Sequence, residues 1–436
     1  MEHVMVGFGF GPIQAGLFAA EARRGGRFAD IAIAEVDAAL VEALRRNGNR
    51  YAVNVACEDG IDVEQVEQVL LLNPRDARDR AELEARLKVA TEIVTSLPSV
   101  NIFTAGGAGS VAALIARGLQ GGSAAGTVVY TAENNNHAAE ILERDVKAAS
   151  NGQAGAFRPV QFLNTVIGKM SQVISDPAEI SRRGLMPIAP GFPRAFLVES
   201  FCHILTSRIQ LPGFEPGIDV FEQKSDLLPF EEAKLFGHNA VHTLLGFIGR
   251  ERGCSGMAQL RDFPDAMELA RHAFIDEAGA ALVKRHAATG DRLFTPDGFR
   301  QYADELLQRM TNPHLNDAVA RIVRDPVRKL GFNDRVFGPM RLCLDNGIEP
   351  RSLACGARAG LKCLLAEPGL VGLPLPADAT GSHVDASEWM ALLQWLWKDD
   401  FNAGDARRIT DGLLVKNRIC PCSTTVAASI PDHARS

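Results

Sequence analysis

The chain has 436 residues, of which 46% are hydrophobic and 23% charged, as in globular proteins with room for two or three domains. A net charge of −7 argues against a broad nucleic-acid-binding surface, because phosphate contacts need clustered lysines and arginines. The sequence shows no signal-peptide pattern, no run near the ~20 apolar residues of a membrane span, and eight cysteines without C-x-x-C spacing. We expect a cytoplasmic protein with reduced thiols that binds neither nucleic acid nor membrane.

Short apolar runs alternate with helical patterns in the first third of the chain. Strands are predicted at residues 3–7, 31–36, 69–73, 101–109 and 127–134. The helices that follow them are predicted to begin near Pro12, Asp37, Arg80, Ser110 and His137. Asp37 and Ser110 have the side chains that cap helix N-termini. This alternation predicts a parallel sheet with right-handed crossovers, an α/β fold.

The pattern changes after about residue 157. Short extended segments with prolines predict irregular or antiparallel strands that flank the sheet. After Pro229 almost every segment has helical periodicity. We therefore predict two domains, residues 1–228 with the sheet and its extra strands, and residues 229–436 as a mostly α-helical domain that carries the substrate and catalytic groups. The last dozen residues are predicted to be loose.

Three glycines follow the first strand, in the sequence VGFGFGP at residues 6–12. A glycine turn that opens a helix is where a dinucleotide pyrophosphate binds, because free N–H groups and the helix dipole face the anion. The third glycine comes one residue earlier than in G-x-G-x-x-G, and a tight structural turn would look similar. Glu35 supports the nucleotide interpretation, since it ends the second strand where an acid hydrogen-bonds the ribose of NAD and repels the 2′-phosphate of NADP.

The first domain is therefore predicted to be a Rossmann-like domain that binds NAD. Ligands of such sheets lie outside the carboxyl ends of the parallel strands, so the ends of later strands should meet the nicotinamide half. The residues predicted to contact the coenzyme are Gly7, Gly9, Phe10, Gly11, Glu35, Thr104, Ala105, Glu133 and Asn134.

The stretch EEAKLFGHNAVH gathers proton-handling side chains within three turns of a predicted helix. Its members are Glu231, Lys234, His238, Asn239 and His242. At about 100° per residue they share one side of a regular helix, while Glu232 falls opposite and is predicted to be solvated. Three interpretations compete: a solvated polar face, a metal site on the two histidines at i, i+4 spacing, and metal-free acid–base chemistry.

Acid–base chemistry accounts best for the residue types. A solvated face would favour Glu and Lys over Asn and His, and an ammonium beside a metal dication costs energy. In this interpretation Lys234 takes the proton of a substrate hydroxyl as hydride leaves for NAD. Asn239 donates to the developing alkoxide, His242 binds the substrate oxygen, and Glu231 relays the proton to solvent.

The spacing Lys234-x4-Asn239-x2-His242 is the signature of the long-chain polyol (mannitol) dehydrogenases. Residues 234–249 and 312–339 resemble segments of mannitol-1-phosphate 5-dehydrogenases, and the similarity spans most of residues 3–365. The resemblance implies a zinc-independent oxidoreductase with a lysine general acid/base. It also implies an oxyanion site made of Asn239 and Asn164, and proton transfer gated by Glu231.

The implied reaction interconverts a linear polyol and its ketose with NAD. The best pair is mannitol 1-phosphate and fructose 6-phosphate; alternatives are an unphosphorylated polyol 2-dehydrogenase, a keto-sugar-acid reductase, or a non-catalytic NAD-sensing protein. Residues 168–171 replace the D-R-I-x-P of the family, which leaves the polyol open. Lys169 and Arg335 either meet a substrate phosphate or carboxylate, or lie at the surface.

Overall fold

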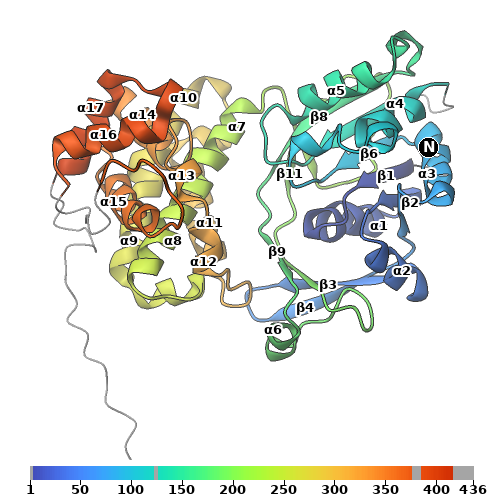
Figure 1. The fold of residues 1–436 in the computed structure, drawn as a ribbon, viewed down its shortest axis with the longest axis horizontal. Helices are drawn as coiled ribbons and strands as arrows, with labels where there is room; N and C mark the ends of the chain where they lie inside the picture. Colours follow the sequence, from blue (N-terminus) through green and yellow to red (C-terminus); the bar gives the residue numbers. More distant parts are fainter. Residues whose placement is uncertain (1–2, 122–125, 376–383, 416–436) are drawn as a thin grey trace, which may run out of the picture. The chain divides into compact units, whose positions relative to one another are not determined.

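The structure is a computed structural model that describes residues 3–121, 126–375 and 384–415 (Figure 1). The chain divides into two compact units, Met1–Glu231 and Glu232–Ser436. None of the helices in the described residues combines the length and apolar character that a bilayer span requires. The tail that was predicted to be loose, and the C-P-C sequence before it, lie outside the described residues.

An eight-stranded sheet forms the centre of the first unit, in the order β12-β11-β8-β7-β6-β1-β2-β5. The strands are β1 His3–Phe8, β2 Phe28–Ala34, β5 Leu70–Leu72, β6 Glu92–Thr95, β7 Thr127–Thr131, β8 Val160–Ile167, β11 Ile204–Ser207 and β12 Phe221–Lys224. The six strands from β5 to β8 are mutually parallel, and β11 pairs antiparallel with β8. The predicted parallel sheet with flanking strands is confirmed.

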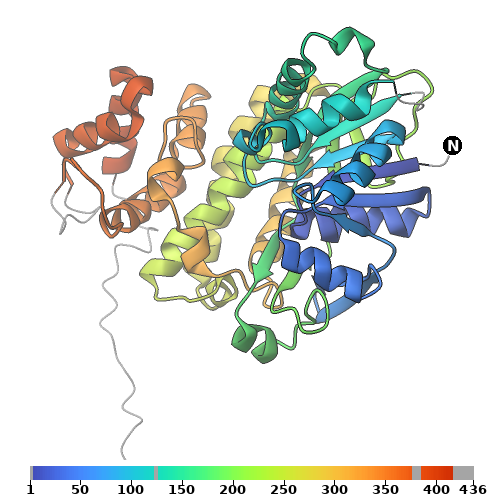
Figure 2. The same ribbon diagram turned by 45° about the vertical axis from the view of Figure 1, so that its right-hand side comes forward.

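Helices cover both faces of this sheet (Figure 2). The first helix begins with the π-helical stretch η1 Gln14–Ala19 and continues as α1 Ala20–Gly25. The others are α2 Ala38–Arg46, α3 Ala77–Val89, α4 Val111–Leu119 and α5 Ala138–Ala149. Met5 packs in the core beneath η1, α1 and α2, whereas Val6 and Phe8 pack in the core beneath α3, α4 and α5. Asp37 and Ser110 cap α2 and α4 as predicted.

A second, four-stranded sheet has the order β4-β3-β10-β9, with β3 Tyr51–Ala56, β4 Ile61–Val66, β9 Ser171–Ile174 and β10 Ala195–Glu199; α6 Pro177–Arg182 lies between the last two in sequence. The β3–β4 hairpin was not predicted. Helix η1 packs against this sheet at Gly16, where an added Cβ would lie 2.8 Å from Val198. The glycine therefore allows close contact between the first helix and the small sheet.

The fourth strand of the main sheet, in chain order, lies earlier than predicted. The helix that begins near Arg80 was predicted to run to residue 94, and residues 101–109 were predicted to be a strand; the structure shows that residues 92–94 are not helical and residues 101–109 are not a strand. Helix α3 ends at Val89, and Glu92–Thr95 forms β6, buried between β1 and β7. Residues 100–109 instead form two short 3-10 turns, η2 Val100–Ile102 and η3 Gly107–Gly109. Pairing with two neighbouring strands decides the structure of the four-residue segment, because β structure depends on tertiary context.

The second unit is helical, as predicted (Figure 1). Helix α7 Leu228–Glu232 spans the boundary between the units. It is followed by η5 Ala233–Asn239, α8 Ala240–Glu251, η6 Met257–Asp262, α9 Pro264–His272, η7 Ala273–Gly279, α10 Ala280–His286, η8 Ala287–Thr289, η9 Arg292–Phe294, α11 Pro296–Met310, α12 Val319–Ile322, α13 Pro326–Lys329, α14 Phe337–Asp345, α15 Arg351–Leu365, α16 Ala386–Trp397, η10 Lys398–Asp400 and α17 Ala403–Leu414. Two of these, η5 and η7, are π-helical.

Candidate active site

The glycine turn lies at the carboxyl end of β1, where the first helix begins. Gly9 has φ +84°, and a Cβ there would lie 2.6 Å from the carbonyl oxygen of Ser96, so only glycine fits. A Cβ on Gly11 would meet nothing within 4 Å. The start of the helix therefore faces open space, as an anion-binding helix N-terminus requires.

Glu35 holds this turn from the end of β2. One carboxylate oxygen accepts the N–H of Phe10 at 2.9 Å, and the other accepts the N–H of Asp37 at 2.8 Å. The Phe10 ring is buried, with its centroid 5.0 Å from that of Tyr51. The Phe10 side chain thus points into the core, and only its backbone lies at the glycine turn, where its N–H donates to Glu35.

Glu133 joins the carboxyl ends of β7 and β6. Its carboxylate accepts the Thr95 hydroxyl at 2.9 Å and the N–H of Leu97 at 2.9 Å, and burial raises its pKa. Asn134 is exposed beside it, and Thr104 and Ala105 are exposed in the turn between η2 and η3. Thr95, at the end of β6, is therefore the residue that lies beside the end of β1. It was not predicted as a site residue, because the strand had been predicted at residues 101–109.

Asn164 lies on β8 and is hydrogen-bonded to α5. Its side-chain oxygen accepts the N–H of Ala139 at 2.9 Å, and its side-chain nitrogen donates to Glu140 at 2.9 Å. One N–H of that amide is left for a further acceptor. The position at the carboxyl side of the sheet agrees with a role toward a bound ligand.

Lys169 is buried in the first unit rather than at the surface. Its ammonium donates to the carbonyl oxygens of Glu199 at 2.5 Å and Phe201 at 2.9 Å, and to Cys202 Sγ at 3.1 Å. Its three donors are therefore directed at protein atoms, which is the pattern of a lysine that ties a loop together.

The signature residues of the second unit lie in a π-helical stretch, not in the regular α-helix that was assumed. Lys234, His238 and Asn239 belong to η5, and His242 follows in α8. A π-helical turn joins residues i and i+5, so Lys234 and Asn239 come to lie one above the other. A regular α-helix would place them about 140° apart. The wider turn therefore brings the proposed base and the oxyanion donor to the same side.

His238 is buried and His242 is mostly buried, and their ring centroids are 6.1 Å apart. Burial, and then its charged neighbours, lower the pKa of His238 well below its usual value. Burial also lowers the pKa of His242 to about 4, against the opposing effect of Asp317. Nε2 of His242 lies 3.8 Å from the Asp317 carboxylate and has no hydrogen-bond partner among the described residues. At neutral pH both rings are thus neutral, and one has a nitrogen available to a ligand.

Glu232 is not solvated, contrary to its predicted position on the outer side of the helix. Its carboxylate lies 2.6 Å from Nε2 of His286 and 3.2 Å from the Arg285 guanidinium. Helix α10, which carries these partners, covers that side of α7. The Glu232 carboxylate, at the end of α7 just before η5, is therefore bound by side chains of α10.

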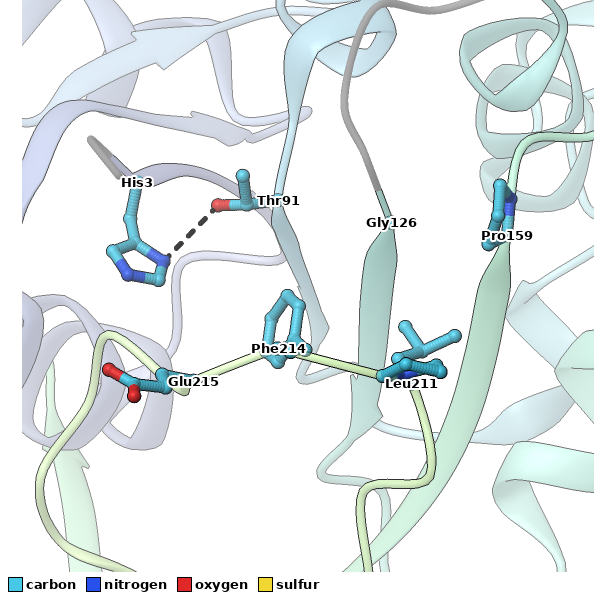
Figure 3. A pocket seen from close by; sticks show the side chains of 9 residues that line it. His3, Thr91, Gly126, Pro159, Leu211, Phe214 and Glu215 are labelled. Atoms are coloured by element: carbon cyan, nitrogen blue, oxygen red, sulfur yellow. Dashed lines mark hydrogen bonds between the residues drawn. The ribbon is translucent and has the colours of Figure 1, made fainter.

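A cavity of about 440 Å³ opens at the opposite edge of the main sheet (Figure 3). It is lined by His3, Thr91, Gly126 and Pro159, which begin or precede β1, β6, β7 and β8, and by residues 211–215. This is the amino edge of the strands, away from the glycine turn. Ligands of parallel sheets bind at the carboxyl edge, so we do not assign the coenzyme to this cavity.

Metal ligands are not gathered in the described part of the chain. Within residues 3–121, 126–375 and 384–415, no three His, Cys, Asp or Glu side chains are close enough to hold an ion together.

Comparison with known proteins agrees with this fold. Residues 226–362 match the family described as mannitol dehydrogenase C-terminal domain. The chain is 28% identical to a mannitol-1-phosphate 5-dehydrogenase of Brevibacillus brevis over 88% of this chain and 89% of that one. A protein of the same name from Pseudarthrobacter chlorophenolicus is 29% identical, over 76% of this chain and 79% of the relative.

Two solved structures share the fold. A D-sorbitol dehydrogenase has a TM-score of 0.73 at 16% identity and covers 94% of this chain and 91% of its own. Pseudomonas fluorescens mannitol 2-dehydrogenase, in a ternary complex with NAD and D-mannitol, has a TM-score of 0.66 at 15% identity and covers 95% and 91%.

A Rossmann-like unit followed by this helical unit defines an oxidoreductase that acts on the CH–OH groups of polyols. Within that class, residues 226–362 match the mannitol dehydrogenase C-terminal domain, and the chain is similar over most of its length to mannitol-1-phosphate 5-dehydrogenases.

Proposed function

We propose that the protein is an NAD-dependent dehydrogenase that interconverts a linear polyol and its ketose, with mannitol 1-phosphate and fructose 6-phosphate as the preferred pair. The carrying observation is that one chain holds both a glycine turn with an acid at the end of β2 and the Lys-Asn-His stretch in a π-helical turn. The names of the curated relatives support the substrate pair, and the ternary complex of the structural relative supports the coenzyme.

The residues of the first unit fit NAD. The open space before Gly11 leaves room for a pyrophosphate at the start of the helix. Each oxygen of Glu35 already accepts one backbone N–H, yet a carboxylate oxygen has a second lone pair for a ribose hydroxyl. When bound, the nicotinamide ring supplies the hydride acceptor for alcohol oxidation.

The residues of the second unit supply the proton chemistry. Lys234 holds the proton of the substrate hydroxyl, and Glu231 passes it toward solvent. The amides of Asn239 and Asn164 donate to the oxygen as negative charge develops on it. His242 is neutral at pH 7, so it orients that oxygen by hydrogen bonding without adding charge.

The test is replacement of Lys234 by Ala. We expect turnover to fall by roughly 10²–10⁴-fold, the usual contribution of a general acid–base group, while NADH affinity measured by fluorescence titration is retained. Lys147→Ala is the matched control, because it removes an exposed lysine of α5, and it should leave both quantities unchanged. Unchanged turnover in Lys234→Ala would refute the proposal.

A substrate panel followed by nicotinamide absorbance separates the alternatives. We expect fructose 6-phosphate to be reduced with NADH faster than fructose, a keto-sugar acid, or any of these with NADPH. Tight NADH binding without reduction of any ketose would instead favour a sensing protein. A chelator should leave the activity intact, whereas the metal interpretation requires its loss.

A further inference from the structure

Lys329 is a mostly buried residue whose ammonium has no partner among the described residues. It ends α13, its exposed fraction is 6%, and it makes no hydrogen bond or ion pair with any described residue. Lys169 is a useful contrast, because it is 7% exposed and donates to three protein atoms. The Lys329 Nζ is not one of the buried, unpartnered atoms of the described residues, so the ammonium reaches solvent and is open to an anion that the described chain does not supply.

The carboxylates around Lys329 are already engaged by arginines. Arg335 donates from Nε to Asp334 at 2.7 Å, and Arg328 lies 3.3 Å from Asp334 and 2.7 Å from Asp325. These are the charged groups that act on the Lys329 ammonium: two guanidiniums that disfavour its protonated form and two carboxylates that favour it. With Lys329 included, positive charge exceeds negative charge here, in a chain whose net charge is −7.

These cations lie next to the Lys-Asn-His stretch. Arg335 and Lys329 both disfavour the protonated form of His242, and Arg335 does the same for His238. Gly338, which follows Arg335 at the start of α14, packs against Phe236 of η5, where an added Cβ would lie 2.5 Å from the ring. The helix that follows Arg335 is therefore in direct contact with the π-helical stretch that carries Lys234.

We propose that Lys329 and Arg335 form the subsite for the phosphate group of the substrate. The inference rests on the proposed function and adds to it the residues that select a phosphorylated polyol. A phosphate dianion matches the excess of positive charge and presents several oxygens to an ammonium and a planar guanidinium. A neutral polyol hydroxyl offers no charge to an ammonium. A carboxylate shares the chemistry but carries a single charge.

The first experiment is calorimetric titration of the full chain with inorganic phosphate, which needs no turnover. The wild type should bind phosphate, and Lys329→Met should lose at least tenfold in affinity. Arg324→Met, which removes an exposed cation nearby, should keep it within twofold. Equal losses in both variants, or none in Lys329→Met, would overturn the assignment. If Lys329→Met fails to fold, Arg335→Gln provides the same test, with Arg335→Lys expected to recover part of the affinity.

The second experiment compares mannitol 1-phosphate with mannitol. In Lys329→Met the KM for the phosphorylated substrate should rise at least tenfold, while the KM for mannitol changes less than threefold. If the wild type oxidises no polyol, the proposed function fails, and the phosphate titration still tests the subsite. If the wild type reduces a keto-sugar acid and Lys329→Met loses only that reaction, the group bound is a carboxylate and the phosphate assignment is wrong.

Discussion

Replacement of Lys329 by Met should stabilise the protein while it abolishes the anion site. Folding lowers the pKa of Lys329 from 10.5 to about 8, chiefly through burial. Each unit of pKa corresponds to 1.36 kcal/mol, so the folded state carries a penalty of about 3 kcal/mol at neutral pH. Methionine is unbranched and can replace the lysine stem without a charge. We therefore expect the variant to gain up to about 3 kcal/mol in the free energy of unfolding at pH 7.

The pH dependence of this gain identifies its cause. Between pH 8 and 10.5 the unfolded chain keeps the Lys329 proton and the folded chain loses it, so wild-type stability rises with pH in this range. The advantage of Lys329→Met should therefore be full below pH 8 and disappear near pH 10.5. Added phosphate should narrow the difference at pH 7, because it binds only the folded wild type.

Urea unfolding followed by tryptophan fluorescence measures this effect in the relevant unit. The three tryptophans, at positions 389, 395 and 397, all lie in α16, so the signal reports on residues 232–436. Urea is uncharged and leaves electrostatic interactions unscreened. A Lys329→Met protein that is less stable than the wild type at pH 7 would refute the reasoning, since it would mean that the ammonium is stabilised by the fold.

Three further changes test other parts of the structure. Gly9→Ala should weaken NADH binding at least tenfold and lower the free energy of unfolding by roughly 1–3 kcal/mol. The reason is that φ is +84° and the new Cβ would lie 2.6 Å from the Ser96 carbonyl oxygen. Fluorescence titration measures the affinity, and urea unfolding measures the stability. Gly237→Ala should destabilise the second unit by about 1–3 kcal/mol through a 2.8 Å contact with a phenylalanine ring, whereas Gly412→Ala, with open space around it, should be neutral or stabilising. The wild-type His242 ring stays neutral down to about pH 4 in the folded protein but is protonated below about pH 6.5 in the unfolded chain, so the wild type loses stability as the pH falls from 7 to 4. His242→Asn should make this loss of unfolding free energy smaller by about 3 kcal/mol. Equal losses in the two proteins would contradict the prediction.

Local patterns were enough to predict the parallel sheet, the two helix caps and the helical second unit. They failed where distant strands decide the structure. Glu92–Thr95 looks like the end of a charged helix, and it is a strand because β1 and β7 pair with it on either side. Residues 51–56 form β3 by pairing with β4 and, at residues 54–56, with β10, which comes more than a hundred residues later. Neither long-range pairing leaves a signal in the nearby sequence.

The candidate site shows the same division. The spacing of Lys234, Asn239 and His242 is visible in the sequence, but the π-helical turn that aligns the first two is not. Lys329 looks like any cation of a charged segment, and only its burial without a partner distinguishes it. Glu232 was placed in solvent because helical phase alone does not reveal that α10 covers it.

The π-helical turn at Ala233–Asn239 makes the spacing of the signature a matter of register. Deleting one residue between Lys234 and Asn239 would let the backbone relax into an ordinary α-helix, in which the two side chains, now four residues apart, would lie about 40° apart. The amine and the amide would then still share one side, on a helix more regular than the original. The wider turn thus accommodates the five-residue spacing of the signature, and at Gly237 the missing side chain leaves room for the Phe274 ring.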